Sequence, residues 1–200
     1  MKKRKIIIPL IILMVAAVSG ILVYRFLFSA VKVTDKEILI EKFNGKEDIS
    51  WYSDLESRSD INAVYGPGAG KELLSEDPLD YVAFDVSCYF RNDSPVSDYW
   101  LNGYLDVGGE YSDRFLFSTV LSMGASEPYV FRGDEDVWGQ SCLVFCRKGL
   151  ADEELEKIAK SLELHITGNG EPLGSVDMVV PMADCSNINI TVSDDYEEES

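Results

Sequence analysis

Residues 81–91, "YVAFDVSCYFR", give the clearest indication of the fold in this sequence. They alternate so that one face carries only apolar side chains: Val82, Phe84, Val86, Cys88 and Phe90. Alternation over this length is typical of a β-strand with one face in a hydrophobic core. Turn-forming residues follow directly in "RNDSP", residues 91–95, and end the strand.

Several more short apolar runs follow this strand. They are "YWLNGYLDV", "EYSDRFLFSTVL", "EPYVFR", "DVWGQSCLVFC", "LELHITG", "SVDMVVPM" and "NINITV". Gly108-Gly109 predicts a hairpin between the first two runs, and Asn102-Gly103 is a rival turn one step earlier. Short strands with turn signals at this spacing predict a mainly β, antiparallel sandwich over residues 79–192.

One helix interrupts the strands, at "ADEELEKIAKSL", residues 151–162. Leu155, Ile158, Ala159 and Leu162 fall on one face at helical spacing. Acidic residues occupy its first turn and lysines come later, which suits the helix dipole. We expect this short helix to cover one end of the sandwich.

Residues 25–78 differ in composition from the segments that follow and predict a juxtamembrane connecting region. Thr34 and Glu37 have the spacing of a capping box, and Asn44-Gly45 provides a stop. The segment "TDKEILIEKFNG", residues 34–45, is therefore expected to be a short helix. A strand is the alternative, because "EILIEKF" also alternates in part.

The N-terminus predicts a membrane anchor. Residues 1–5 form a basic tail, and residues 6–24 are an uncharged run whose length as a helix, about 28 Å, matches a bilayer core of about 30 Å. The basic tail indicates a cytoplasmic N-terminus, so the rest of the chain should be extracytoplasmic in a single-pass protein of the cell membrane. Cleavage of a signal peptide near Val18-Ser19-Gly20 is the alternative.

The exported part is strongly acidic. Beyond residue 25 it has thirteen Lys or Arg and all 35 Asp or Glu, a net charge of −22. This charge argues against nucleic acid as a partner, because phosphate binding needs clustered cations. It suits a soluble domain or one that meets a basic partner. Residues 193–200, "SDDYEEES", predict a disordered acidic tail.

Residues 80–167 resemble the immunoglobulin-like domains of uncharacterised bacterial membrane-anchored surface proteins. The resemblance is carried by "YVAFDVSCYF", "RNDSP", "LDVGGEY" and "DEDVWGQSCLVF" in this order. It implies a sandwich fold and an extracytoplasmic binding or structural role. It implies no catalytic residues.

Four cysteines are candidates for disulfides in an exported chain: Cys88, Cys142, Cys146 and Cys185. Cys142 and Cys146 lie about 13 Å apart if their segment is extended, too far for a bond. Cys88 with either of them, and Cys185 with the other, remain as pairings. Free, buried thiols are the equally weighted alternative.

No cofactor, metal or catalytic site is predicted. The glycine-rich "YGPGAGKELL", residues 65–74, has Tyr65 where a phosphate loop needs its first glycine, and Glu72 in place of the hydroxyl residue. His165 is the single histidine and falls on the polar face of its strand. Acid pairs such as those in "GDEDVWG" have no specific spacing for calcium or for a glycosidase.

Aromatic residues are the best candidates for ligand contact, namely Tyr99, Trp100, Tyr104 and Tyr111. Such rings stack on sugars or anchor protein interfaces, although packing across strands is the favoured explanation. The sequence therefore predicts a non-catalytic binding or scaffolding module of the cell envelope, with an unknown protein or envelope ligand as partner. The alternative is an envelope hydrolase that uses paired carboxylates.

Overall fold

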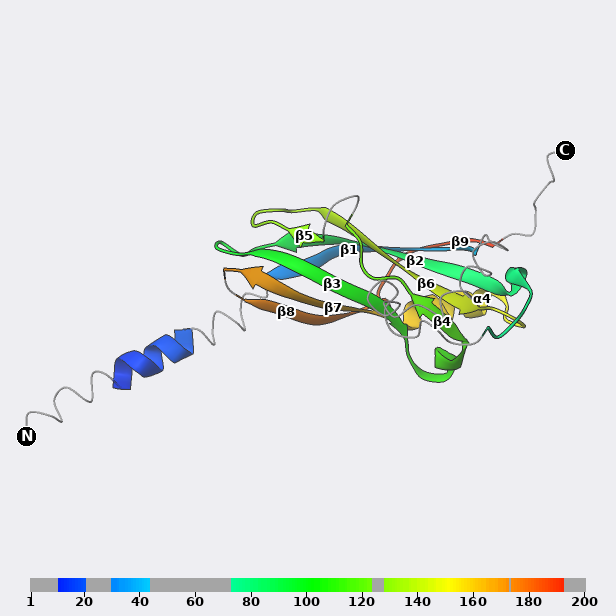
Figure 1. Ribbon diagram of the computed structural model, residues 1–200, viewed down its shortest axis with the longest axis horizontal. Coiled ribbons are helices and arrows are strands. Elements are labelled where there is room, and N and C mark those ends of the chain that lie inside the picture. Colours follow the sequence, from blue (N-terminus) through cyan, green and yellow to red (C-terminus); the bar gives the residue numbers. More distant parts are fainter. Residues whose placement is uncertain (1–10, 21–29, 44–72, 124–127, 173, 193–200) are drawn as a thin grey trace, which may run out of the picture.

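The computed structural model describes residues 11–20, 30–43, 73–123, 128–172 and 174–192 (Figure 1). Its strands form two sheets with one α-helix and two 3-10 helices beside them. The strands are β1 (Val31–Lys42), β2 (Tyr81–Asn92), β3 (Asp98–Val107), β4 (Phe115–Ser118), β5 (Tyr129–Val130), β6 (Val137–Cys146), β7 (Leu162–Glu171), β8 (Ser175–Pro181) and β9 (Asn187–Thr191). The helices beside the sheets are η2 (Pro78–Asp80), η3 (Gly109–Arg114) and α4 (Asp152–Ser161), and residues 11–20 form a further helix before β1.

The two sheets lie in separate layers (Figure 1). The first sheet has the strand order β4-β6-β2-β1-β9, and the second has the order β5-β3-β7-β8. All pairs are antiparallel except β1 with β9, which is parallel. One hydrophobic cluster contains buried side chains from both sheets and from α4. The prediction of a mainly β chain with two sheets and antiparallel strands is confirmed.

β2 buries the apolar face that its sequence predicts. Val82, Phe84, Val86, Cys88 and Phe90 are all fully buried in the shared core. The other face of β2 is also covered at one end, because Tyr81 belongs to a second, smaller cluster with Leu116, Phe117, Val144 and Cys146. The first sheet therefore buries part of its outer side as well.

The helix expected over residues 34–45 is wrong, because residues 31–42 form strand β1. Ile38 pairs with Val86 of β2, and Ile40 pairs with Phe84. β1 lies between β2 and β9 within the first sheet, so both of its edges are occupied. Pairing on two sides and burial of alternate side chains outweigh a local capping signal. Residues 31–42 thus belong to the folded unit and not to a connector.

The hairpin expected at Gly108-Gly109 does not form. β3 ends at Val107, the chain then makes η3, and β4 pairs with β6 in the first sheet. Beyond β4 the chain returns to β3 at an isolated antiparallel bridge between Tyr104 and Val120. The rival turn at Asn102-Gly103 lies inside β3. A Cβ on Gly103 would lie 2.7 Å from the His165 carbonyl oxygen, so this glycine permits close strand approach and not a turn.

The helix expected over residues 151–162 is confirmed as α4, with Leu155, Ile158 and Ala159 buried. Glu154 accepts a hydrogen bond from the Ala151 N–H at 3.1 Å and so stabilises the first turn. Leu162, expected as the last helical contact, begins β7 instead. α4 carries the chain from the first sheet to the second at the end of the molecule where β6 ends and β7 begins.

Residues 11–20 are helical, and their side chains are exposed. In the part of the chain that the structure describes, no helix is both long and apolar enough to cross a bilayer. The predicted span over residues 6–24 extends beyond the described helix at both ends, so it stays a prediction. The basic tail at 1–5 and the acidic tail at 193–200 lie outside the described residues, as does the stretch 44–72 of the expected connecting region.

Candidate functional site

The described elements leave the outer face of the second sheet uncovered along β3, β7 and β8. Its outward positions on β3, β7 and β8 are exposed or half-buried, while the intervening positions point into the core. These three strands contain no lysine or arginine. Five carboxylates lie on this face: Asp98, Asp106, Glu163, Glu171 and Asp177.

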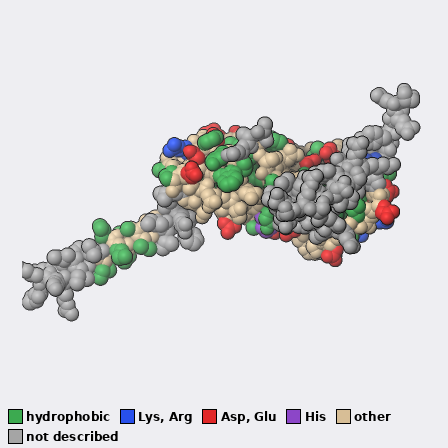
Figure 2. Space-filling view, in the orientation of Figure 1, with side chains coloured by type: hydrophobic (Ala, Val, Ile, Leu, Met, Phe, Trp, Pro, Cys, Tyr) green, Lys and Arg blue, Asp and Glu red, His purple; other side chains and the backbone are tan. Residues whose placement is uncertain are grey.

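Three aromatic rings stack at one edge of this face, and we call them the aromatic corner: Trp100, Tyr129 and Phe131. The ring centroids of Trp100 and Tyr129 are 6.5 Å apart, and those of Tyr129 and Phe131 are 5.9 Å apart, with planes within 19°. Trp100 is 52% exposed and Phe131 is 56% exposed. Figure 2 shows hydrophobic side chains gathered over the region where Figure 1 places β5.

A second aromatic pair lies further along the same face. Tyr104 and His165 are paired across β3 and β7, and their rings stack with centroids 5.1 Å apart and planes 4° apart. The Glu163 carboxylate is 3.6 Å from His165 Nε2. His165 lies on the polar side of its strand, as expected, but it is half-buried by stacking and not freely solvated.

The structure separates the four aromatics that the sequence singled out. Trp100 and Tyr104 lie on the outer face, whereas Tyr99 is buried beneath it, with its hydroxyl near Gly174. Tyr111 is on η3 and packs against the core. The sequence reasoning missed Tyr129 and Phe131. The alternation of "EPYVFR", which places both on the side opposite Val130, was the signal that could have found them.

The four cysteines are free thiols in the structure. Cys88 points into the core from β2, whereas Cys142 and Cys146 lie on the other side of the first sheet, opposite Asp85 and Tyr81. Side chains on opposite faces of paired strands diverge, so this arrangement does not bring Cys88 to either of them. Burial raises the pKa of the Cys88 thiol to about 12, so it is a poor nucleophile.

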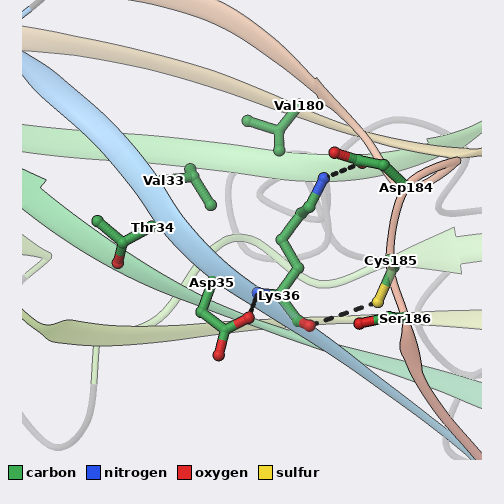
Figure 3. Close-up of a pocket in the computed structure, with 8 residues that line it drawn as sticks. All are labelled: Val33, Thr34, Asp35, Lys36, Val180, Asp184, Cys185 and Ser186. Atoms are coloured by element: carbon green, nitrogen blue, oxygen red, sulfur yellow. Dashed lines mark hydrogen bonds and ion pairs between the residues drawn. The ribbon is translucent and has the colours of Figure 1, made fainter.

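A pocket of about 300 Å³ lies between β1 and the connection from β8 to β9 (Figure 3). β1 has a bulge between Val33 and Asp35 at this point. The Lys36 side chain extends from β1 toward Asp184, donating hydrogen bonds to its carboxylate and, at 2.8 Å, to the Pro181 carbonyl oxygen (Figure 3). The hydrogen bond from Lys36 holds the pKa of Asp184 below its usual value.

The polar groups of this pocket bind one another. The Cys185 thiol donates to the carbonyl oxygens of Lys36 at 3.4 Å and Asn187 at 3.5 Å. The Lys36 ammonium group therefore forms an ion pair that holds the β8–β9 connection against β1. The thiol is hydrogen-bonded to backbone carbonyl oxygens. Covalent catalysis needs a nucleophilic side chain with a base positioned to activate it, and the residues that line the pocket include no such pair.

A pair of carboxylates that could serve a hydrolase lies on the outer side of the first sheet. Burial and the neighbouring Asp85 carboxylate raise the pKa of Glu41, and burial raises the pKa of the adjacent Cys142 thiol well above its usual value. Glu41 is nevertheless exposed, and it does not line the pocket described above. Among the described residues, no group of three His, Cys, Asp or Glu side chains is placed to hold a metal ion.

Most of the glycine-rich loop, residues 65–72, lies outside the described residues. No protein-family model matches the chain, and neither a curated protein nor a solved structure is significantly similar to it. The resemblance to immunoglobulin-like surface domains stays a prediction.

Proposed function

We propose that this chain is a membrane-tethered, extracytoplasmic binding module without a catalytic role, and that it binds through the outer face of the second sheet. The proposal rests on the aromatic corner, because two of its large rings, Trp100 on β3 and Phe131 directly after β5, are more than half exposed. Exposed aromatic rings of this kind are enriched at binding surfaces.

The tether is supported by the helical residues 11–20. Ile11, Ile12, Leu13, Met14, Val15 and Val18 are between 51% and 72% exposed. A helix that is apolar all round needs an apolar environment, and the hydrophobic run in the sequence extends beyond it on both sides. With the basic residues 2–5 before the run, the sandwich would lie on the extracytoplasmic side.

We further propose that the sandwich is immunoglobulin-like. In that fold one sheet has the strand order A-B-E-D and the other has C-F-G. Here β1-β2-β6-β4 follows the first order and β3-β7-β8 follows the second. The chain departs from the fold in four ways: it adds the parallel strand β9, it adds β5 beside β3, it turns Trp100 outward on the third strand, and it has no cysteine on β7.

Site-specific photocrosslinking in intact envelopes tests this function. A photoreactive amino acid replaces Asn102, an exposed position in the middle of the proposed face. The matched control replaces Leu39, an exposed position on the outer side of β1 in the other sheet. Neither position is expected to disturb the core.

We expect the Asn102 probe to give a discrete adduct that the Leu39 probe does not give. The adduct should be lost when the aromatic corner is removed by Trp100→Ala with Phe131→Ala. Adducts from both positions, or none from Asn102, would contradict the proposed face. Protease added to whole cells should remove the sandwich if it is extracytoplasmic, and protection of the sandwich would contradict the orientation.

A further inference from the structure

We infer that the aromatic corner rests on the surface of the lipid bilayer to which the chain is tethered. This inference relies on the proposed tether and names the partner of one part of the proposed binding face. It rests on three observations: the end of the sandwich at which the chain enters, the location of the corner at that same end, and the chemistry of the corner.

The chain enters the sandwich at a fixed point. Ala30 is held by a hydrogen bond from the Asp93 N–H to its carbonyl oxygen at 2.6 Å, and Val31 pairs with Asn92. Residues 25–29 separate this point from Tyr24, the last residue of the predicted span. Six Cα–Cα steps reach at most about 21 Å, so this end of the sandwich must stay near the bilayer.

The aromatic corner lies at the same end. The Asn92 side-chain amide donates a hydrogen bond to the Val130 carbonyl oxygen at 3.1 Å. Val130 stands between Tyr129 and Phe131, so one buried side chain connects the entry point of the tether to the corner. Figure 1 shows β5 toward the end of the sheets at which β1 begins.

The chemistry of the corner suits the headgroup region of a bilayer. Tryptophan and tyrosine are enriched at membrane–water interfaces, where an apolar ring and a polar group are both accommodated. Trp100 and Phe131 expose more than half of their surface. Val96, on the turn between β2 and β3 at this end, is also 44% exposed. A bilayer would cover apolar surface that no described element covers.

Charge attraction does not explain such a contact. Lys32, Arg91 and Arg132 lie at this end, but each is within 3.6 Å of Asp93 or Asp98. Residues 134–136, "DED", and Glu171 add unbalanced negative charge here. The rings must therefore make the contact, and anionic lipid should weaken it. The carboxylates further along the outer face carry negative charge that a bilayer does not accommodate, so the contact with the bilayer is limited to the aromatic corner.

Fluorescence quenching in vesicles tests the inference with the full chain. One variant keeps Trp100 alone (Trp51→Phe, Trp138→Phe), and its matched control keeps Trp138 alone (Trp51→Phe, Trp100→Phe). Trp138 is 40% exposed and lies near the same end of the sandwich, but on the outer side of the first sheet. Each variant is reconstituted in phosphatidylcholine vesicles with and without brominated acyl chains, which quench tryptophan on contact.

We expect bromination to quench Trp100 strongly and to leave Trp138 almost unchanged. Adding Phe131→Ser should reduce the quenching of Trp100, whereas Leu79→Ser, at a 70% exposed position near the opposite end, should not. Replacing part of the phosphatidylcholine by phosphatidylglycerol should also reduce it. Equal quenching of both tryptophans, no quenching of Trp100, or stronger quenching with anionic lipid would overturn the inference.

Alkaline carbonate extraction of the same vesicles separates this inference from the tether. A chain that resists extraction while Trp100 stays unquenched refutes the contact and leaves the tether standing. A chain that is extracted refutes the tether and the inference that relies on it.

Discussion

The Asn92 side-chain amide nitrogen lies 3.1 Å from the Val130 carbonyl oxygen and joins the end of β2 in the first sheet to β5 at the edge of the second. The same nitrogen donates to the Ser97 carbonyl oxygen at 2.9 Å, and the amide oxygen accepts the Ser94 N–H at 2.9 Å. Asn92 is almost fully buried. One side chain therefore fixes both the β2–β3 turn and the strand that carries the aromatic corner.

Asn92→Ala should destabilise the protein by about 1–3 kcal/mol, because it removes the side-chain partner of buried backbone groups such as the Val130 carbonyl oxygen. The free energy of unfolding in urea measures the loss. Asn102→Ala, at an exposed position, is the control and should change stability by less than about 0.5 kcal/mol. Equal effects of the two substitutions would contradict the role of Asn92.

Gly168→Ala should also destabilise the protein. Gly168 pairs with Leu101 across β7 and β3, and a Cβ on it would lie 2.6 Å from the Trp100 carbonyl oxygen. The strands would have to separate beneath the proposed binding face, at a cost of about 1–3 kcal/mol. Gly108→Ala is a matched control, because a Cβ there would meet no atom within 4 Å. Thermal unfolding should show a lower Tm for the first variant alone.

The four thiols should be free in the isolated protein. Mass spectrometry after unfolding in iodoacetamide without reductant should find four alkyl groups per chain. Before unfolding, reaction at pH 8 should be slow at Cys88, because a thiol with a pKa of about 12 is almost entirely protonated there. Two missing alkyl groups would reveal a disulfide and a departure from the arrangement in the structure.

Asp85→Asn should lower the pKa of Glu41. Burial and then the Asp85 charge raise that pKa above its ordinary value of 4.5, so the ionised Glu41 is disfavoured in the folded state relative to the unfolded one. Removing the charge should stabilise the protein at pH values above the raised pKa of Glu41. This gain in stability should fade as the pH falls toward the ordinary pKa of a glutamate.

Carbon-13 NMR of the Glu41 carboxyl group measures this pKa directly. Asp106→Asn, which removes a carboxylate from the other sheet, is the control and should leave the pKa of Glu41 unchanged. A pKa that is the same in Asp85→Asn and in the unsubstituted protein would show that burial acts alone.

The strand around Cys88 and the helix around Ile158 were predictable because their patterns are local. Alternation places side chains on two faces of any strand, and helical spacing places Leu155, Ile158 and Ala159 on one side of any helix. β1 was not predictable in the same way. Thr34 and Glu37 have the spacing of a helix cap, and the competing preference came from β2 and β9, which are distant in the sequence.

The candidate site was predictable in part. Trp100 and Tyr104 are two of the aromatic residues that the sequence offers for ligand contact, and both lie on the outer face. Tyr99 was selected with them although it follows the inward alternation of β3. Tyr129 and Phe131 were not predicted because β5, Tyr129–Val130, has only two residues and Phe131 follows it. The position of β5 beside β3 depends on long-range pairing.

Local patterns in the sequence are enough to indicate which side chains share a face, where the helix between β6 and β7 forms, and how acidic the molecule is. Long-range packing sets which sheet each strand joins, places Cys88 and Cys142 on opposite sides of one sheet, and brings Trp100, Tyr129 and Phe131 together. The two kinds of information differ in the range over which the interactions act. Periodicity and capping act between neighbours in the chain, whereas strand pairing depends on the burial that many distant residues achieve together.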